Sequence, residues 1–221
     1  MNITRTEKRS PLHRWHASHC DNWCQLGETP LPWQFASAEE EQSAARDLAL
    51  CDLSGLPLLE VKGPAAAAWL TDRNLPVPAT IYEGQSTDEG DWITRTGSEE
   101  FLLRSAASDS QPGLSGSDPA GEVLITDRQD AIFVVAGHRI GELMAQTCGL
   151  DYASLPAHQT HLSRIAGVSC GMIKDQLNGI PVCWLWLDPS YALYLWEQLV
   201  QITTDLDGKT VGVSCFYPDI A

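Results

Sequence analysis

Two stretches of this 221-residue sequence share one plan and decide the expected fold: LPLLEVKGPAAAAWL at residues 56–70 and AIFVVAGHRIGELMAQTCGL at residues 131–150. Each begins with a short apolar run typical of a strand, turns at a glycine, and continues with helical spacing. The motif at Val61–Gly63 aligns with the one at Val135–Gly137. This alignment predicts one supersecondary unit used twice, although strand–glycine–helix units are common enough to recur by chance.

The flanking segments predict further helices and short strands. A capping box at Ser37 and Glu40 starts a helix, and apolar residues at helical spacing extend it as far as Cys51. Pro189 starts a final helix that is apolar nearly all round, so we expect it to be buried on more than one side. A closing strand is expected at Lys209–Phe216. Other strands are expected at residues 58–61, 80–85, 91–95, 101–104, 132–135 and 182–187. Hairpin-like strand clusters with few crossover helices predict an α+β fold with two similar sheet-plus-helix halves.

One internal stretch interrupts this pattern. Residues 105–121 read SAASDSQPGLSGSDPAG and are nearly all Ser, Ala, Gly, Pro and Asp. Such a composition cannot bury enough apolar surface to fold alone. We therefore expect a first half at residues 1–108, a flexible linker at 109–121 and a second half at 122–221.

The charge of the chain narrows the classes of partner. There are 29 acidic and 14 basic residues, for a net charge of −15. Such a surface repels phosphate backbones and anionic lipid, so we expect no nucleic-acid or membrane partner. The longest apolar run, Ile180–Leu187, is far shorter than the roughly 18 residues of a membrane helix. Seven scattered cysteines suit a reducing compartment, and we expect a cytoplasmic location.

A cluster near the N-terminus has ligand-type side chains. His13, His16 and His19 are spaced three apart, and Cys20 follows His16 by four residues. On a helix His16 and Cys20 would share a face, as zinc ligands require. The spacing matches no familiar zinc motif, and no second ligand pair such as CxxC occurs. We therefore expect no metal site and a structural or surface role for these residues.

A second cluster offers carboxylates in one loop. Asp88, Glu89 and Asp91 precede an expected strand, and the loop could hold an amine, supply a base, or form a solvated hairpin turn. The turn is the commoner role. No cysteine has the setting of a catalytic thiolate. The sequence has no GxGxxG, GxxxxGK, GxSxG or HExxH motif, which disfavours a nucleotide-dependent or self-contained hydrolytic enzyme.

The first half carries elements in the order and spacing of the start of the glycine-cleavage T-protein, a folate-dependent aminomethyltransferase. They are Ser10-Pro11-Leu12, His16, the Pro30–Phe35 loop, Glu41, Arg46, Asp52-Leu53-Ser54 and Val61–Gly63. On these residues the first half resembles the aminomethyltransferase family.

The second half resembles the gamma subunit of heteromeric sarcosine oxidase. The shared features are Gly137 with the helix after it, Cys148-Gly149-Leu150-Asp151, Gln159-Thr160-x-Leu162, and Ser190-Tyr191-Ala192 with Leu195-Trp196. This resemblance implies a T-protein-like fold in a small subunit with no redox cofactor and no assigned catalytic role. In that family, larger flavoprotein subunits hold the flavins, the nicotinamide cofactor and a folate site. Together they oxidise N-methyl groups and pass formaldehyde to tetrahydrofolate.

The chain departs from the T-protein pattern at the catalytic loop. The family places its catalytic aspartate in an Asn-x-x-Gly-Gly-x-x-Asp-Asp loop, and the corresponding region here, Thr87–Trp92, lacks the paired glycines. Asp91 is the nearest catalytic candidate, and His16 and Asp91 are the candidate folate contacts. The Lys-Gly-Cys-Tyr-x-Gly-Gln signature of the folate-dependent iron–sulfur repair proteins is absent. The expected function is a non-catalytic gamma-type subunit that binds no cofactor. The alternative is a free-standing one-carbon transfer protein that binds tetrahydrofolate.

Aromatic residues favour the subunit hypothesis. The chain has eight tryptophans and five tyrosines, and such rings are enriched at the centres of protein interfaces. Trp184 and Trp186 share one face of an expected strand because side chains alternate. The expected interface residues are Trp184, Trp186, Tyr191, Tyr194 and Trp196, against a flavoprotein partner. The same rings could instead fill the core of this chain.

Overall fold

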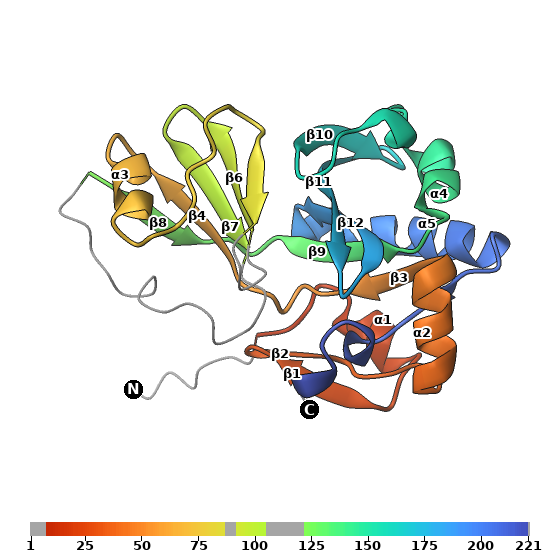
Figure 1. The fold of residues 1–221 in the computed structure, drawn as a ribbon. Helices are drawn as coiled ribbons and strands as arrows, with labels where there is room; N and C mark the ends of the chain where they lie inside the picture. The colour runs from red at the N-terminus through yellow and green to blue at the C-terminus, as the bar shows by residue number, and fades with distance from the viewer. Residues whose placement is uncertain (1–7, 87–91, 105–121, 221) are drawn as a thin grey trace, which may run out of the picture.

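The structure is a computed structural model that describes residues 8–86, 92–104 and 122–220 (Figure 1). The α-helices are α1 (His13–Ala17), α2 (Ala38–Asp47), α3 (Ala66–Thr71), α4 (Ile140–Thr147) and α5 (Ala192–Asp205). The strands are β1 (Trp23–Leu26), β2 (Thr29–Pro32), β3 (Ala49–Asp52), β4 (Leu58–Lys62), β5 (Gly84–Ser86), β6 (Trp92–Gly97), β7 (Glu100–Arg104), β8 (Leu124–Asp127), β9 (Ala131–Ala136), β10 (Thr160–Ile165), β11 (Val168–Leu177), β12 (Ile180–Leu187) and β13 (Lys209–Thr210). Short 3-10 helices are η1 (Tyr152–Ser154), η2 (Pro189–Tyr191), η3 (Val213–Cys215) and η4 (Pro218–Ile220).

Two larger sheets and one hairpin make up the strand framework. The six-stranded sheet has the order β10-β11-β12-β9-β3-β13, and the five-stranded sheet has the order β5-β6-β7-β4-β8. Strands β1 and β2 form a separate antiparallel hairpin. In Figure 1 the five-stranded sheet and α3 occupy the left of the view, and the six-stranded sheet with α2, α4 and α5 the right. The α+β class with two similar sheet-plus-helix units is confirmed.

The two units exchange their first strands. Strand β3 precedes β4 in the chain, yet it pairs antiparallel with β9 in the other sheet. Strand β8 precedes β9, yet it pairs antiparallel with β4. Each exchanged strand therefore takes the same place beside the central strand of the opposite sheet. As a correction to the expected halves, neither 1–108 nor 122–221 forms a self-contained sheet. The stretch 105–121 lies outside the described residues.

The glycines of the repeated motif have the same structural role in both units. Gly63 and Gly137 have φ values of +128° and +109°, in the region that side chains disfavour. A Cβ would lie 2.2 Å from the Glu122 carbonyl oxygen at the first site and 2.1 Å from that of Asp47 at the second. Each contacted carbonyl lies just before an exchanged strand. The glycines are needed because the backbone of the exchanged strand enters against them.

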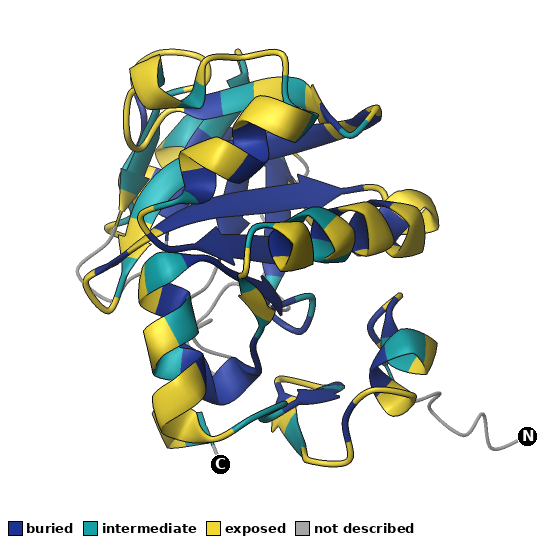
Figure 2. Ribbon diagram, turned by 90° about the vertical axis from the view of Figure 1, so that its right-hand side faces the viewer, coloured by how far each residue is buried: buried dark blue, intermediate teal, exposed yellow. Residues whose placement is uncertain are grey.

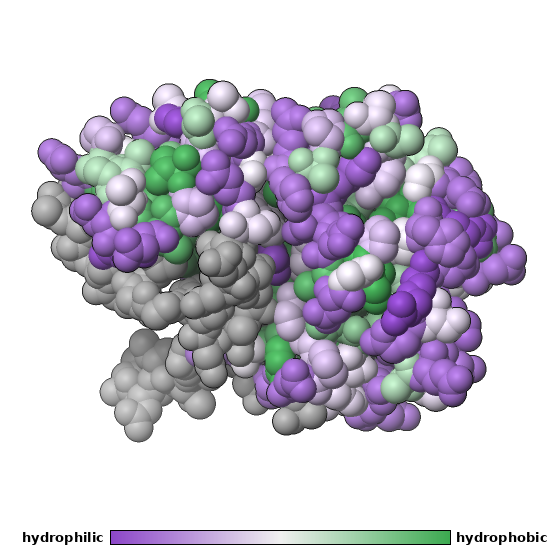
Figure 3. All heavy atoms as spheres, viewed as in Figure 1, coloured by the Kyte–Doolittle hydropathy of each residue, from purple (hydrophilic) through white to green (hydrophobic). Residues whose placement is uncertain are grey.

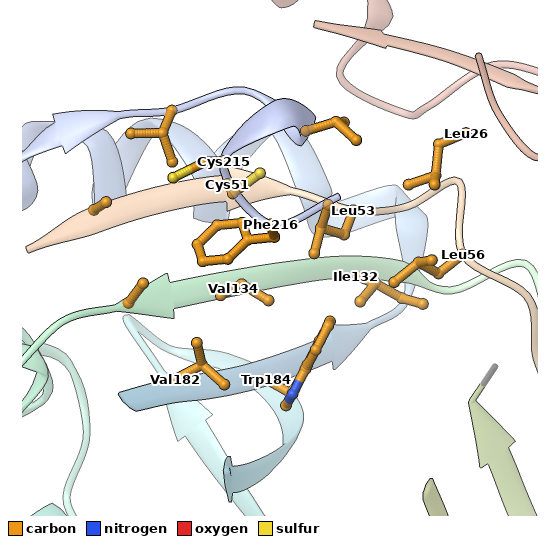
Figure 4. Packing of buried hydrophobic residues seen from close by; sticks show 14 of the residues in the cluster. Leu26, Cys51, Leu53, Leu56, Ile132, Val134, Val182, Trp184, Cys215 and Phe216 are labelled. Atoms are coloured by element: carbon orange, nitrogen blue, oxygen red, sulfur yellow. The ribbon is translucent and has the colours of Figure 1, made fainter. Parts of the chain in front are cut away.

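Strand β12, inside the six-stranded sheet, is buried on both faces. Alternate residues of β12 divide between two clusters: Val182, Trp184 and Trp186 face one, and Cys183, Leu185 and Leu187 face the other. The first cluster includes residues from η3 and both larger sheets. Figure 4 shows the part of it in which Cys215 and Phe216 lie against Cys51 and Val134 of the six-stranded sheet. The second lies against α4 and α5, whose outer faces are exposed (Figure 2). The prediction that Trp184 and Trp186 share a face is confirmed.

Four expected elements differ from those observed. The strand expected at residues 80–85 is strand only at Gly84–Ser86. The helix after Ser37 has the expected capping box, but α2 ends at Asp47 and residues 49–52 form β3. This short apolar run is buried on both faces between neighbouring strands, an environment that periodicity alone cannot tell from a helix. Helix α5 buries one face only, since Leu193 and Tyr194 are exposed. The closing segment is strand only at Lys209–Thr210 and then becomes η3.

Candidate functional site

Asp52, at the end of β3, is the centre of a buried polar network. The Ser10 hydroxyl donates to Oδ2 at 2.5 Å, and His16 Nε2 lies 2.8 Å from the same oxygen. The Ser54 hydroxyl and backbone N–H donate to Oδ1 at 2.6 and 2.9 Å. The Ser54 hydroxyl also accepts from the Ile132 N–H at 3.0 Å. The network joins the N-terminal segment to β3 and β9.

The surroundings of this network are apolar. The side chains of His16 and Asp52 are each 1% exposed. Burial alone would raise the pKa of Asp52, but the hydrogen bond and charge of His16 and the two serine hydroxyls hold that pKa below its usual value. Four aromatic rings have centroids within 6.3 Å of the His16 ring. The contacts of His16, a candidate folate contact, are those of a core residue that fixes the N-terminal segment. Its cofactor role stays a prediction.

A second buried carboxylate, Glu41 of α2, also has a structural set of contacts. Its Oε1 accepts from the backbone N–H groups of Phe35 and Ala36 at 2.6 and 3.1 Å, and its Oε2 accepts from Gly212 N–H at 3.1 Å. The side chain thus joins the loop before α2 to the C-terminal segment. Two of the positions shared with the T-protein, Glu41 and Asp52, are therefore acceptors that hold loops together.

Burial keeps six of the described thiols protonated at neutral pH. Burial raises the pKa of Cys24 to about 11 and those of Cys170 and Cys215 to about 12, and it also raises the pKa of Cys20, Cys51 and Cys183. No group of three or more His, Cys, Asp or Glu side chains that could hold a metal occurs in the described residues. Within the same residues, no helix is long and apolar enough to cross a membrane.

The carboxylate loop of the catalytic prediction lies outside the described residues. Asp88, Glu89 and Asp91 all belong to the undescribed stretch 87–91. The catalytic and folate-contacting roles of Asp91 therefore stay predictions.

The three tryptophans expected at an interface lie in the core. Trp184, Trp186 and Trp196 are 1%, 8% and 0% exposed. The Arg104 guanidinium lies 4.0 Å from the centroid of the Trp184 ring, and Trp186 contacts the Trp92 ring at 5.4 Å. This corrects the expectation of an exposed indole flank. Strand β12 lies inside its sheet and both faces are covered, so its rings pack within this chain.

The two tyrosines of the interface prediction are exposed. Tyr191 and Tyr194 are 56% and 51% exposed and line a cavity of about 510 Å³ beside the β10–β11 turn. The Tyr194 hydroxyl donates to the Ala166 carbonyl at 3.3 Å, which holds the ring against that turn. A second cavity of about 500 Å³ shares three lining residues with the first. We call the two together the tyrosine groove, lined by Leu162, Arg164, Ser169, Asp188, Tyr191 and Tyr194 among others.

The floor of the tyrosine groove is one face of the six-stranded sheet. Leu162, Gly171, Trp186 and Ile132 lie in register across four strands. A Cβ on Gly171 would lie 2.0 Å from Trp186 Cε2, so the missing side chain makes room for the indole. Polar groups lie next to this row: Arg164 is paired with Ser169, and Asp188 directly follows Leu187, the last residue of β12. The groove therefore combines an apolar row with a charged row.

A charged cluster forms one wall of the groove. Arg128 Nη2 donates to Asp130 Oδ2 at 2.9 Å, and its Nη1 donates to Glu60 Oε1 at 2.8 Å. Burial raises the pKa of Asp130 in spite of its bonds to Arg128. Lys62 also pairs with Glu60 at 3.1 Å. The charges of this wall are mutually compensated.

A third cavity, of about 660 Å³, lies between α4 and the β11–β12 hairpin. Its basic groups have internal partners: Lys174 donates to the carbonyls of Tyr152 and Leu155 at 3.0 and 2.8 Å. His138 and His158 lie 3.2 and 3.5 Å from aspartate oxygens. The tyrosine groove has less compensated charge than this cavity.

The interface prediction included three lining residues of the groove, Trp186, Tyr191 and Tyr194, and did not include Leu162 and Arg164. The available signal was their spacing, because residues two positions apart in a strand share a face. Polar surface side chains are too common for such a pattern to indicate a site without the tertiary structure.

No protein-family model matches the chain. Among curated proteins, the aminomethyltransferase of Synechococcus elongatus is 25% identical over 220 residues, which cover 90% of this chain and 59% of that protein. The aminomethyltransferase of Deinococcus deserti is 22% identical over 212 residues, with 88% and 59% coverage. The chain thus spans about three fifths of the length of these relatives.

Two solved structures share the fold. The glycine cleavage system aminomethyltransferase T of Bartonella henselae superposes with a TM-score of 0.74 at 18% identity, over 95% of this chain and 61% of that chain. A chain of the heterotetrameric sarcosine oxidase of Corynebacterium sp. U-96 superposes with a TM-score of 0.62 at 12% identity, over 92% of this chain and 98% of that chain. The protein described here therefore has the mixed α and β fold of the glycine cleavage aminomethyltransferase.

Proposed function

We propose that this chain is a non-catalytic gamma-type subunit of a heteromeric, sarcosine oxidase-like flavoenzyme that oxidises N-methyl amines and transfers the one-carbon product to folate. One observation carries the proposal: the superposition covers 98% of a chain of heterotetrameric sarcosine oxidase and 92% of this chain. Larger flavoprotein subunits would hold the redox cofactors, and this chain would bind none.

The chemistry of the described residues supports a non-catalytic role. Asp52 and Glu41 are buried carboxylates, and each already accepts three or more hydrogen bonds from its own chain. A general base needs a free lone pair within reach of a substrate proton. The six cysteines with raised pKa values are protonated at neutral pH. They are therefore poor nucleophiles, because the thiolate is the reactive form.

Native purification from the source organism tests the proposal. The chain is tagged at its own locus, purified at low salt and passed through size-exclusion chromatography with light scattering. We expect it to elute with larger chains and with the visible absorbance of flavin. Elution as a monomer without flavin absorbance would contradict the subunit role.

A second candidate function has its own support. The curated relatives are aminomethyltransferases, and the TM-score to aminomethyltransferase T, 0.74, exceeds the 0.62 to the oxidase chain. The alternative is a free-standing tetrahydrofolate-binding one-carbon transfer protein. Calorimetric titration of the purified chain with tetrahydrofolate separates the two. Saturable heat would favour the alternative, and no heat at millimolar ligand would exclude it.

A further inference from the structure

We propose that the tyrosine groove is the surface on which the flavoprotein subunit docks. The occupant is an extended segment of that subunit, with an acidic residue opposite Arg164 and a basic residue opposite Asp188. An apolar side chain of the segment packs against Tyr191 and Tyr194. The inference rests on the proposed function and names the contact surface within it.

The apolar part of the groove is exposed and gathers three large apolar side chains. Leu162, Tyr191 and Tyr194 are 62%, 56% and 51% exposed, and they line adjoining cavities of about 500 and 510 Å³. Elsewhere hydrophilic residues dominate the view in Figure 3, where apolar residues gather in small separate patches. Tyrosine presents a large contact area with a polar tip, which suits a surface that is wet before a partner binds.

The charges of the groove define what the occupant must carry. Within the described residues, the Arg164 guanidinium has no hydrogen-bond or ion-pair partner. Among the same residues, the Asp188 carboxylate accepts from the hydroxyl and N–H of Ser190, at 2.6 and 2.9 Å, and has no basic partner. These bonds lower the pKa of Asp188, so the carboxylate is ionised at neutral pH. The groove therefore presents a guanidinium and a carboxylate that form no ion pair with any other described residue.

The spacing of these charges sets the shape of the occupant. Arg164 pairs with Ser169, and Asp188 directly follows Leu187, whose partner is Cys170, so the two charged residues lie about two strand spacings, roughly 10 Å, apart. An extended chain advances about 3.3 Å per residue and only residues an even number of positions apart face the same side, so its acidic and basic residues would be two or four positions apart, about 7 or 13 Å. Charge complementarity of this kind fixes register and orientation more than it adds affinity.

The groove is also rigid enough to act as a template. Its floor is a three-strand section of sheet, β10, β11 and β12, and Trp186 lies across Gly171 with 8% exposure. The Tyr194 ring is held by its bond to the Ala166 carbonyl. A surface ordered before binding loses less conformational entropy on association.

The test uses the purified complex of the native purification, with variants of this chain. We expect Tyr191→Ser with Tyr194→Ser, and separately Arg164→Glu, to weaken association with the flavoprotein about tenfold or more. Asp188→Asn keeps an acceptor for Ser190 but removes the charge, and it should weaken association in the same direction. Leu193→Ser is the matched control, because Leu193 is 47% exposed on the same helix and does not line the groove. Binding is measured by biolayer interferometry and by flavin absorbance per mole of chain, with unfolding curves to verify each variant.

The outcomes separate this inference from the proposed function. If the wild-type chain carries no flavoprotein, the subunit role fails and the docking surface fails with it. If the wild-type chain assembles and the groove variants bind as tightly as Leu193→Ser, the subunit role stands and the groove is not the docking surface. Recovery of Arg164→Glu binding by a charge reversal in the partner segment would establish the contact.

Discussion

Asp52 shows how much of this fold depends on a single side chain. It accepts hydrogen bonds from Ser10 and Ser54 and lies against His16, so removing it leaves buried groups without a partner. We expect Asp52→Ala to lower the free energy of unfolding by about 3–5 kcal/mol, measured by urea denaturation. The exposed Asp21 is the control, and Asp21→Ala should change stability by less than about 0.5 kcal/mol. Equal effects of the two substitutions would contradict a structural role for the network.

The same residue predicts a pH dependence. Its pKa is lower in the folded chain than in the unfolded chain, where it is about 4. The unfolded state therefore takes up protons first on acidification, and the stabilisation from ionised Asp52 is lost as the pH falls through the folded pKa. We expect the stability difference between wild type and Asp52→Asn to be full above about pH 5 and to shrink below about pH 4. A difference that is constant with pH would rule out this linkage.

Gly171 is a second residue with a specific prediction. An added methyl group would collide with the Trp186 indole, so Gly171→Ala should lower the free energy of unfolding by about 1–3 kcal/mol and shift tryptophan fluorescence. Gly141 in α4 is the matched control, because an added Cβ there meets nothing within 4 Å. Gly141→Ala should be neutral or stabilising by about 0.5–1 kcal/mol, since alanine favours helix.

At the scale of elements, α2 is held in place by side chains at its beginning. Ser37 and Glu40 form the capping box, and Glu41 bonds the preceding loop and the C-terminal segment. We expect Glu41→Ala to cost roughly 2–4 kcal/mol, because three backbone N–H groups lose their acceptor. Glu41→Gln keeps one acceptor oxygen and should cost about half as much. Urea denaturation with limited proteolysis of the 33–37 loop measures both, and equal costs would show that the backbone donors find other acceptors.

At the scale of the whole molecule, the exchange of β3 and β8 makes the two sheets interdependent. A fragment of residues 122–221 lacks β3, and a fragment of residues 1–108 lacks β8, so each has an incomplete sheet. We expect neither fragment to unfold cooperatively alone, while the full chain shows one transition by circular dichroism and by fluorescence. A cooperative transition of the isolated 122–221 fragment would contradict this dependence.

The proposed function also depends on the arrangement of the whole molecule. The buried carboxylates and thiols of the described residues serve the interior, whereas the groove between β10 and α5 has exposed rings and uncompensated charge. Such an arrangement suits recognition of another chain rather than chemistry on a small molecule. We therefore propose that the catalytic activity belongs to a partner subunit and that this chain contacts the partner through the groove.

The sequence by itself determined the features that depend on neighbours along the chain. These are the strand–glycine–helix unit in both halves, the capping box of α2, and the common face of Trp184 and Trp186. Backbone preference, capping and side-chain alternation act over a few residues, so a local pattern suffices to predict them.

Only the tertiary structure decided which strand joins which sheet, and therefore which side chains are exposed. Residues 49–52 became a strand because β9 and β13 pair with its two edges and the two hydrophobic clusters bury its faces. The tryptophans of β12 became core residues for the same reason, and Arg164 and Tyr191 met at a groove although they are far apart in sequence. Burial is a property of the folded chain, because the hydrophobic effect is non-directional and does not specify which apolar groups pack together.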